Sequence, residues 1–199
     1  MTTRDVRWLQ LFGWSHSGKT RVLTAVIRLL SADGRRVLAI KHSHHRCPEG
    51  DPTTASDTAA FLGAGAAAAL LLTPDGACIH TRPSSTPKRL HAVPVATAVH
   101  DALETVRADW LVVEGGHDWG TPKVGMAGPT DLKPGAPPVL AILGPAGQPG
   151  LLRGPENPAG DPGAAALWIL AHAHRVSARV KDLALHEALE RGPAAAGAG

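Results

Sequence analysis

Short apolar runs alternate with segments of helical periodicity along most of this chain. Residues 6–12 (VRWLQLF) form the first apolar run, and residues 20–30 (TRVLTAVIRLL) then place apolar side chains at the spacing of one helix face. Residues 36–40 (RVLAI) form a second buried run. The pattern predicts a strand, a glycine-containing loop, a helix and a second strand, which together make one βαβ unit.

The same alternation continues toward the end of the sequence. It predicts strands over residues 66–73, 109–114 and 139–143, and helices over residues 54–62, 95–107, 167–175 and 179–191. The alanines of residues 66–73 suit a helix equally well by propensity. Strands that alternate with helices indicate a three-layer α/β domain, with a mainly parallel sheet flanked by helices.

Length and composition narrow the class of protein. With 199 residues, 44% hydrophobic and 19% charged, the chain predicts one globular domain over residues 1–191 and a flexible tail over residues 192–199. Lysine and arginine number 20 against 17 acidic residues, and they are scattered along the chain. The net charge of +3 is too small to indicate nucleic-acid binding.

The cysteines and the apolar stretches indicate where in the cell the protein is expected. Cys47 and Cys78 lie far apart, and no secretory signal pattern opens the chain, so we expect a reduced, cytoplasmic protein with Cys78 as a small buried residue. The longest apolar stretch, residues 64–72, is about half the length that a membrane helix needs. We expect the tryptophans to be packing residues, except Trp14.

The strongest chemical signal lies between the first predicted strand and helix. It fits G-x-x-x-x-G-K-[ST] at every fixed position, over Gly13, Trp14, Ser15, His16, Ser17, Gly18, Lys19 and Thr20. Such a phosphate-binding loop (P-loop) wraps backbone N–H groups around phosphates at a helix N-terminus, where the macrodipole favours negative charge. Lys19 would neutralise the terminal phosphates and the Thr20 hydroxyl would bind Mg²⁺.

Glu114 is the second signal, at the end of a predicted strand and before two glycines. In sheets of this kind, ligands bind beyond the carboxyl ends of the strands. We therefore expect Glu114 to face the phosphates and either to hold Mg²⁺ with Thr20 or to orient a water molecule. A solvated acid at a strand end is the alternative.

Together with residues 41–45 (KHSHH), these motifs resemble the MobB family of molybdopterin guanine dinucleotide biosynthesis. Further matches are the segments SDT at 56–58, AGA at 64–66, VEG at 113–115, PK at 122–123 and GDP at 160–162. Two positions depart from the family pattern. Ser43 stands where the family often has Asp, and Ala55–Ser56 replaces a Gly-Lys pair.

The resemblance implies a P-loop protein that binds GTP with Mg²⁺ and hydrolyses it weakly or not at all. It implies a homodimer that assists a MobA-like nucleotidyltransferase, with residues 122–126 as one candidate edge strand for the dimer. The choice of GTP over ATP rests on the resemblance alone, because the chain contains no Asn-Lys-x-Asp motif. Asp57 becomes a second acid near Mg²⁺, so Asp57 and Glu114 are the candidate catalytic residues.

Two other functions remain open. The first is a metallochaperone GTPase that binds zinc through a His-rich loop, although the tight spacing favours a phosphate-sensing loop instead. The second is a small-molecule kinase with residues 144–163 as its lid. The candidate zinc ligands are His42, His44, His45 and Cys47, whereas we expect His100, His172 and His174 on helix surfaces.

Overall fold

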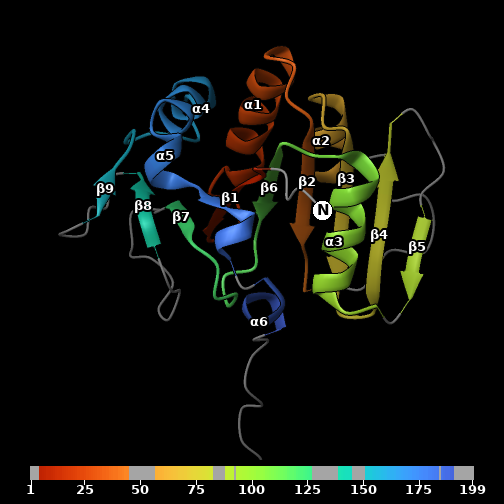
Figure 1. Ribbon diagram of the computed structural model, residues 1–199. Coiled ribbons are helices and arrows are strands. Elements are labelled where there is room, and N and C mark those ends of the chain that lie inside the picture. Colours follow the sequence, from red (N-terminus) through yellow and green to blue (C-terminus); the bar gives the residue numbers. More distant parts are fainter. Residues whose placement is uncertain are drawn as a thin grey trace, which may run out of the picture.

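The computed structural model describes residues 5–44, 57–82, 88–91, 93–126, 139–144, 151–183 and 185–190. These residues build one sheet with helices on both of its faces (Figure 1). The elements in chain order are β1 (Arg7–Gly13), α1 (Lys19–Ala32), β2 (Val37–His42), α2 (Asp57–Gly63), β3 (Ala68–Thr73), β4 (Gly76–Thr81), β5 (Lys88–His91), α3 (Val95–Val106), β6 (Trp110–Glu114), β7 (Lys123–Met126), β8 (Val139–Leu143), β9 (Leu152–Arg153), α4 (Pro162–Ala171), α5 (Ala173–Val176), β10 (Ala178–Arg179), the 3₁₀ turn η1 (Val180–Asp182) and α6 (Leu185–Glu190).

The sheet is mainly parallel, as the sequence predicts. Its strand order is β5-β4-β3-β2-β6-β1-β7-β8-β9, and β10 pairs with β1. All neighbours from β3 through β9 in this order run parallel, whereas β4, β5 and β10 pair antiparallel. The carboxyl ends of β1, β2 and β6 therefore lie side by side at one edge of the sheet.

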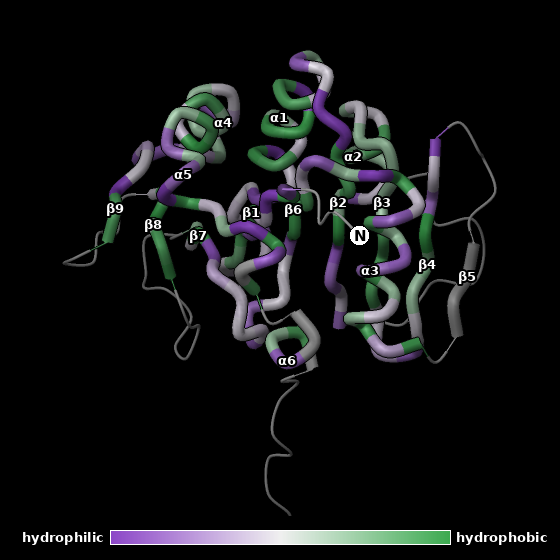
Figure 2. Tube along the Cα trace, in the orientation of Figure 1, coloured by the Kyte–Doolittle hydropathy of each residue, from purple (hydrophilic) through white to green (hydrophobic). Residues whose placement is uncertain are grey.

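Two apolar clusters fill the space between the sheet and its helices. One lies under α1, α2 and α4 and receives Leu9 and Leu11 of β1, while the other lies under α3 and α6 and receives Trp8. In α1 the fully buried Val22, Leu23, Val26 and Ile27 follow the helical repeat, which explains why this segment packs as a helix. Strand β8 and the middle of β4 are hydrophobic in Figure 2, whereas one end of β4 is hydrophilic.

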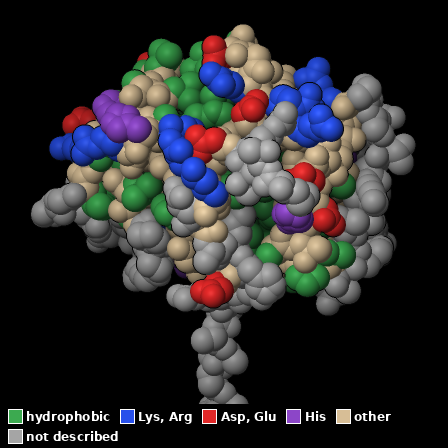
Figure 3. Space-filling model, viewed as in Figure 1, with side chains coloured by type: hydrophobic (Ala, Val, Ile, Leu, Met, Phe, Trp, Pro, Cys, Tyr) green, Lys and Arg blue, Asp and Glu red, His purple; other side chains and the backbone are tan. Residues whose placement is uncertain are grey.

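Several expectations about the surface and core are met. Trp8, Trp110, Trp119 and Cys78 are buried, while Trp14 is 47% exposed. Basic and acidic side chains are interspersed on the face shown in Figure 3. None of the described helices is long and apolar enough to span a membrane.

Three parts of the architecture differ from the sequence-based expectation. Strands β4 and β5 were not predicted, and they extend the sheet as an antiparallel hairpin. The predicted helix over residues 179–191 is wrong in its first half, because residues 178–179 pair with β1 before the chain turns into η1 and α6. Helix α4 begins at Pro162 rather than at residue 167, because the Asp161 side chain accepts a hydrogen bond from the Ala164 backbone N–H at 2.9 Å and caps its start.

The candidate dimer edge over residues 122–126 is also wrong. Strand β7 lies between β1 and β8 and is buried throughout, so it is an inner strand of the sheet. Residues 45–56, which contain His45 and Cys47, and the predicted tail over residues 192–199 lie outside the described residues. The extent of the domain, residues 1–191, stays a prediction.

Candidate functional site

The P-loop connects β1 to α1, as the motif predicts. Gly18 precedes α1 with a φ of 87°, a left-handed conformation that favours glycine. A Cβ atom at this position would lie 2.6 Å from the Cβ of Ala159, so Gly18 also permits the segment before α4 to pack against the loop. The loop and the adjacent strand ends line a cavity of about 790 Å³.

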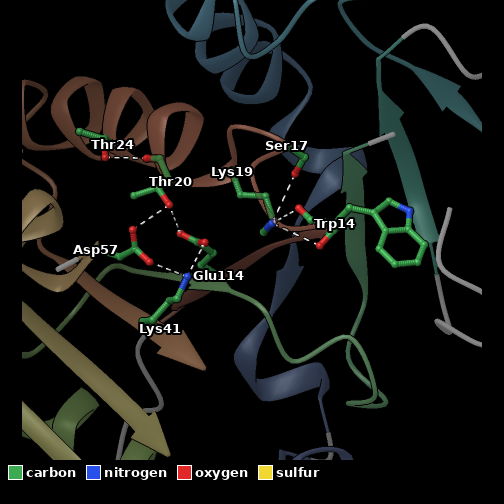
Figure 4. Close-up of polar contacts among 9 residues, drawn as sticks. Trp14, Ser17, Lys19, Thr20, Thr24, Lys41, Asp57 and Glu114 are labelled. Carbon is green, nitrogen blue, oxygen red and sulfur yellow. Dashed lines mark hydrogen bonds and ion pairs between the residues drawn. The ribbon is translucent and has the colours of Figure 1, made fainter. Parts of the chain in front are cut away.

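Lys19 folds back over its own loop (Figure 4). Its Nζ donates hydrogen bonds to the carbonyl oxygens of Trp14 at 2.6 Å and Gly13 at 3.2 Å, and to the Ser17 Oγ at 3.3 Å. A phosphate is a stronger partner for this ammonium than these neutral oxygens, because it adds the attraction between opposite charges. Lys19 thus lies beside the cavity, with its ammonium on the oxygen atoms of its own loop.

Four side chains form a closed polar ring next to the P-loop (Figure 4). The Thr20 Oγ1 lies 3.0 Å from the Asp57 Oδ1 and 2.8 Å from the Glu114 Oε2. The Lys41 Nζ lies 2.6 Å from the other oxygen of each carboxylate, Asp57 Oδ2 and Glu114 Oε1. We call these residues, Thr20, Lys41, Asp57 and Glu114, the acidic ring.

Strand register places the acidic ring. Lys41 and Glu114 are register partners on the neighbouring parallel strands β2 and β6, and both lie near the carboxyl ends of these strands. Thr20 lies in the first turn of α1, and Asp57 is the first residue of α2. Three crossovers of the chain therefore bring these side chains together, as expected for ligand sites in parallel sheets.

The acidic ring places one ammonium group beside two carboxylates that differ in burial. The Glu114 side chain is 3% exposed, whereas those of Lys41 and Asp57 are 23% and 36% exposed. Burial by itself would lower the pKa of Lys41, but the carboxylates of Glu114 and Asp57 outweigh that effect and raise its pKa above the ordinary value. Lys41 is therefore a permanent cation at neutral pH, and it offsets part of the negative charge.

The oxygen atoms of the ring fit Mg²⁺. Mg²⁺ prefers oxygen ligands in an octahedron at about 2.0–2.1 Å, which places adjacent ligands about 3 Å apart. The Thr20 Oγ1 meets Asp57 Oδ1 and Glu114 Oε2 at 3.0 and 2.8 Å, and its single proton can be donated to one of them at a time. Thr20, Asp57 and Glu114 could therefore hold the ion directly or through its water shell.

His42 and His44 of the KHSHH segment line another part of the cavity. The ring of His42 contacts the rings of His44 and Trp119, with centroids 5.2 and 4.9 Å away. Burial lowers the pKa of His42 below its ordinary value, so His42 is neutral at pH 7. Within the described part of the chain, no three His, Cys, Asp or Glu residues come together as a metal site.

Sequence reasoning missed two buried polar residues behind the site. The Gln10 side chain donates to the carbonyl oxygens of Gly115 and Gly116 at 2.7 and 2.8 Å. The Gln10 side-chain oxygen in turn accepts a hydrogen bond from Thr121. Gln10 therefore fixes the start of the loop after Glu114. The sequence feature that could have indicated this role is a polar residue inside an apolar strand.

Lys123 fixes the rest of that loop. It is fully buried, and its Nζ donates to the carbonyl oxygens of Gly116 at 3.2 Å, His117 at 2.8 Å and Trp119 at 2.6 Å. Burial lowers the pKa of Lys123 to about 8, with Asp118 opposing the shift. Lys123 belongs to the PK pair of the sequence resemblance, but no sequence pattern indicated that it would be buried.

Comparison with known proteins identifies the family. The family model of molybdopterin guanine dinucleotide synthesis protein B, MobB, matches residues 8–137, about two thirds of the chain. The matched region contains the whole P-loop and the acidic ring. Among curated proteins, a search found no match.

Solved structures of MobB proteins also match. The structure of Bacillus subtilis MobB is 19% identical, with a TM-score of 0.49, over 82% of this chain and 95% of that chain. A MobB homologue from Bacillus stearothermophilus is 18% identical, with a TM-score of 0.46, over 85% of this chain and 97% of that chain. On the family match over residues 8–137, this chain belongs to the MobB family of molybdopterin guanine dinucleotide synthesis proteins.

Proposed function

We propose that this protein binds GTP with Mg²⁺ at the P-loop and acts as an accessory protein in molybdopterin guanine dinucleotide synthesis. The observation that carries the proposal is the contact between Thr20 and Glu114 beside the P-loop. A hydroxyl from the P-loop and an acid from a neighbouring strand end are the combination that P-loop proteins use for the magnesium ion of a nucleotide.

Each part of the site has a role in this proposal. The backbone N–H groups of the loop surround the phosphates, and Lys19 exchanges its carbonyl partners for the terminal phosphates. Thr20 and Glu114 hold Mg²⁺ or its waters, and Asp57 supplies a second carboxylate. When bound, Mg²⁺ neutralises charge on the phosphate oxygens.

The ion pairs of the ring favour weak hydrolysis. A general base must accept a proton from the attacking water, but Asp57 and Glu114 are ion-paired with Lys41 at 2.6 Å without a nucleotide and would face Mg²⁺ with one. All four oxygens of these two carboxylates already contact Thr20 or Lys41, so neither acid is placed to take a proton from a water molecule. We therefore propose nucleotide binding with little or no intrinsic GTPase activity as the basis of the function.

The proposed partner is a MobA-like nucleotidyltransferase, and the proposed assembly is a homodimer. The test is capture of purified nucleotidyltransferase by the immobilised protein, with and without GTP and Mg²⁺. We expect capture that depends on GTP and is reduced in Lys19→Ala, while Lys181→Ala, an exposed lysine on η1, behaves as the wild type. No capture under any condition would contradict the accessory function. Equal affinities for ATP and GTP would contradict the proposed preference for the guanine nucleotide.

A further inference from the structure

The Lys41 ammonium contacts the two carboxylates that the proposed Mg²⁺ would bind, so it already supplies positive charge at that place. We propose that Lys41 is the resident counter-cation of the acidic ring in the nucleotide-free protein, and that Mg²⁺ must displace its ammonium from Asp57 and Glu114. The displacement makes metal binding depend on the nucleotide. This inference rests on the proposed function, because it concerns the regulation of the same site.

The contacts show that Lys41 and a metal would share their ligands. Each carboxylate of the ring uses one oxygen for Thr20 and the other for Lys41, all within 3.0 Å. Within the described ranges, Lys41 is the one cation that is ion-paired with either carboxylate. A metal that binds Asp57 and Glu114 therefore competes with the Lys41 ammonium for the same two groups.

Burial explains why a counter-cation is needed. Glu114 is almost fully buried, and an unpaired buried carboxylate carries a large desolvation penalty. Two carboxylates that both contact the Thr20 hydroxyl also repel each other. The Lys41 ammonium reduces both effects, so the ring is stable before a metal arrives.

The position of Lys41 links this exchange to the nucleotide. Lys41 lines the same cavity as the P-loop residues Gly13, Lys19 and Thr20. An ammonium that leaves the carboxylates needs another anion, and the phosphates of a nucleotide in this cavity would supply one. Without a nucleotide, the displaced charge has no such partner, and Mg²⁺ is therefore disfavoured.

The experiment measures Mn²⁺ binding to the nucleotide-free protein by electron paramagnetic resonance of the free ion, since Mn²⁺ also prefers oxygen ligands. Lys41→Met removes the ammonium that competes with the metal for Asp57 and Glu114. We expect the Mn²⁺ affinity to rise at least about tenfold, because one charge beside a carboxylate typically changes its equilibrium with a cation by that factor or more. The matched control Lys181→Met changes an exposed lysine and should bind Mn²⁺ like the wild type. Adding Glu114→Gln to Lys41→Met should abolish the gain.

Unchanged or weaker Mn²⁺ binding in Lys41→Met would overturn the inference. If that variant does not fold, the wild type gives the answer through acetylation of Lys41 by acetic anhydride, followed by mass spectrometry, during a titration with Mg²⁺ that is carried to concentrations high enough to fill the nucleotide-free site. Faster acetylation as Mg²⁺ binds supports displacement, whereas a constant rate while Mg²⁺ binds contradicts it. Titration of the wild type with GTP is independent of these readouts. A failure to bind GTP would overturn the proposed function and the link to the nucleotide, but not the competition between Lys41 and the metal.

Discussion

The Thr20 Oγ1 and the Glu114 Oε2 lie 2.8 Å apart, although 94 residues separate them in the sequence. One belongs to the first turn of α1 and the other ends β6, so their contact depends on the central parallel part of the sheet. The same contact connects the P-loop to the Lys41 ion pairs. Because of this contact, we expect GTP binding at the site to depend on Mg²⁺.

Glu114→Gln should keep the shape of the side chain and remove one negative charge. We expect the affinity for GTP to lose most of its dependence on Mg²⁺, because a hard divalent cation is held more strongly by a carboxylate than by a neutral carbonyl. The measurement is GTP binding with and without Mg²⁺. Glu104→Gln, an exposed residue on α3, is the matched control and should respond like the wild type. An unchanged Mg²⁺ response in Glu114→Gln would remove Glu114 from the metal site.

Gly18→Ala should destabilise the protein more than Gly34→Ala does. Both glycines have positive φ, at 87° and 75°, so each alanine costs about 1–2 kcal/mol of backbone strain. At Gly34 nothing lies within 4 Å of the new Cβ, whereas at Gly18 the Cβ would meet Ala159 at 2.6 Å. Overpacking of this kind adds about 1–3 kcal/mol. Urea denaturation measures the free energy of unfolding of both variants. Equal losses of stability would show that the close approach of the new Cβ to Ala159 costs nothing.

Lys123 should give the protein a stability that rises with pH above 8. Its pKa is lowered from 10.5 to about 8 in the folded protein, so between these values the unfolded chain binds more protons than the folded one. The penalty of burying a protonated lysine is present below pH 8 and disappears as pH rises toward 10.5.

The comparison variant is Lys123→Met, which cannot titrate at this position. Relative to Lys123→Met, the wild type should gain on the order of 2 kcal/mol of unfolding free energy between pH 7 and 9.5. Urea denaturation at several pH values measures this difference. A difference that stays constant over this range would mean that Lys123 keeps an ordinary pKa in the folded protein.

Local patterns predicted the part of the fold that contains the P-loop. The loop and α1 are specified by nearby residues, because the motif, the glycine at position 18 and the helical repeat lie within one segment. The β4 strand was missed although its turn signal was present, since Pro74, Asp75 and Gly76 form a typical turn sequence after β3.

The acidic ring could be predicted in part. A strand-end acid beside a P-loop indicated Glu114, and the family resemblance indicated Asp57. The ion pair with Lys41 could not be predicted, because it depends on the register between β2 and β6, which local sequence does not determine. Lys123 was missed for another reason: lysine is almost never fully buried, and the three carbonyl acceptors that permit it come from a loop.

The most direct test of the account is calorimetric titration of the wild type and Lys19→Ala with GTP in the presence of Mg²⁺. Loss of a charge-assisted phosphate contact of about 1.5–3 kcal/mol should weaken binding about tenfold to a hundredfold while the variant stays folded. Lys181→Ala, which removes an exposed lysine, should bind GTP like the wild type. Equal affinities of the wild type and Lys19→Ala would contradict nucleotide binding at this P-loop.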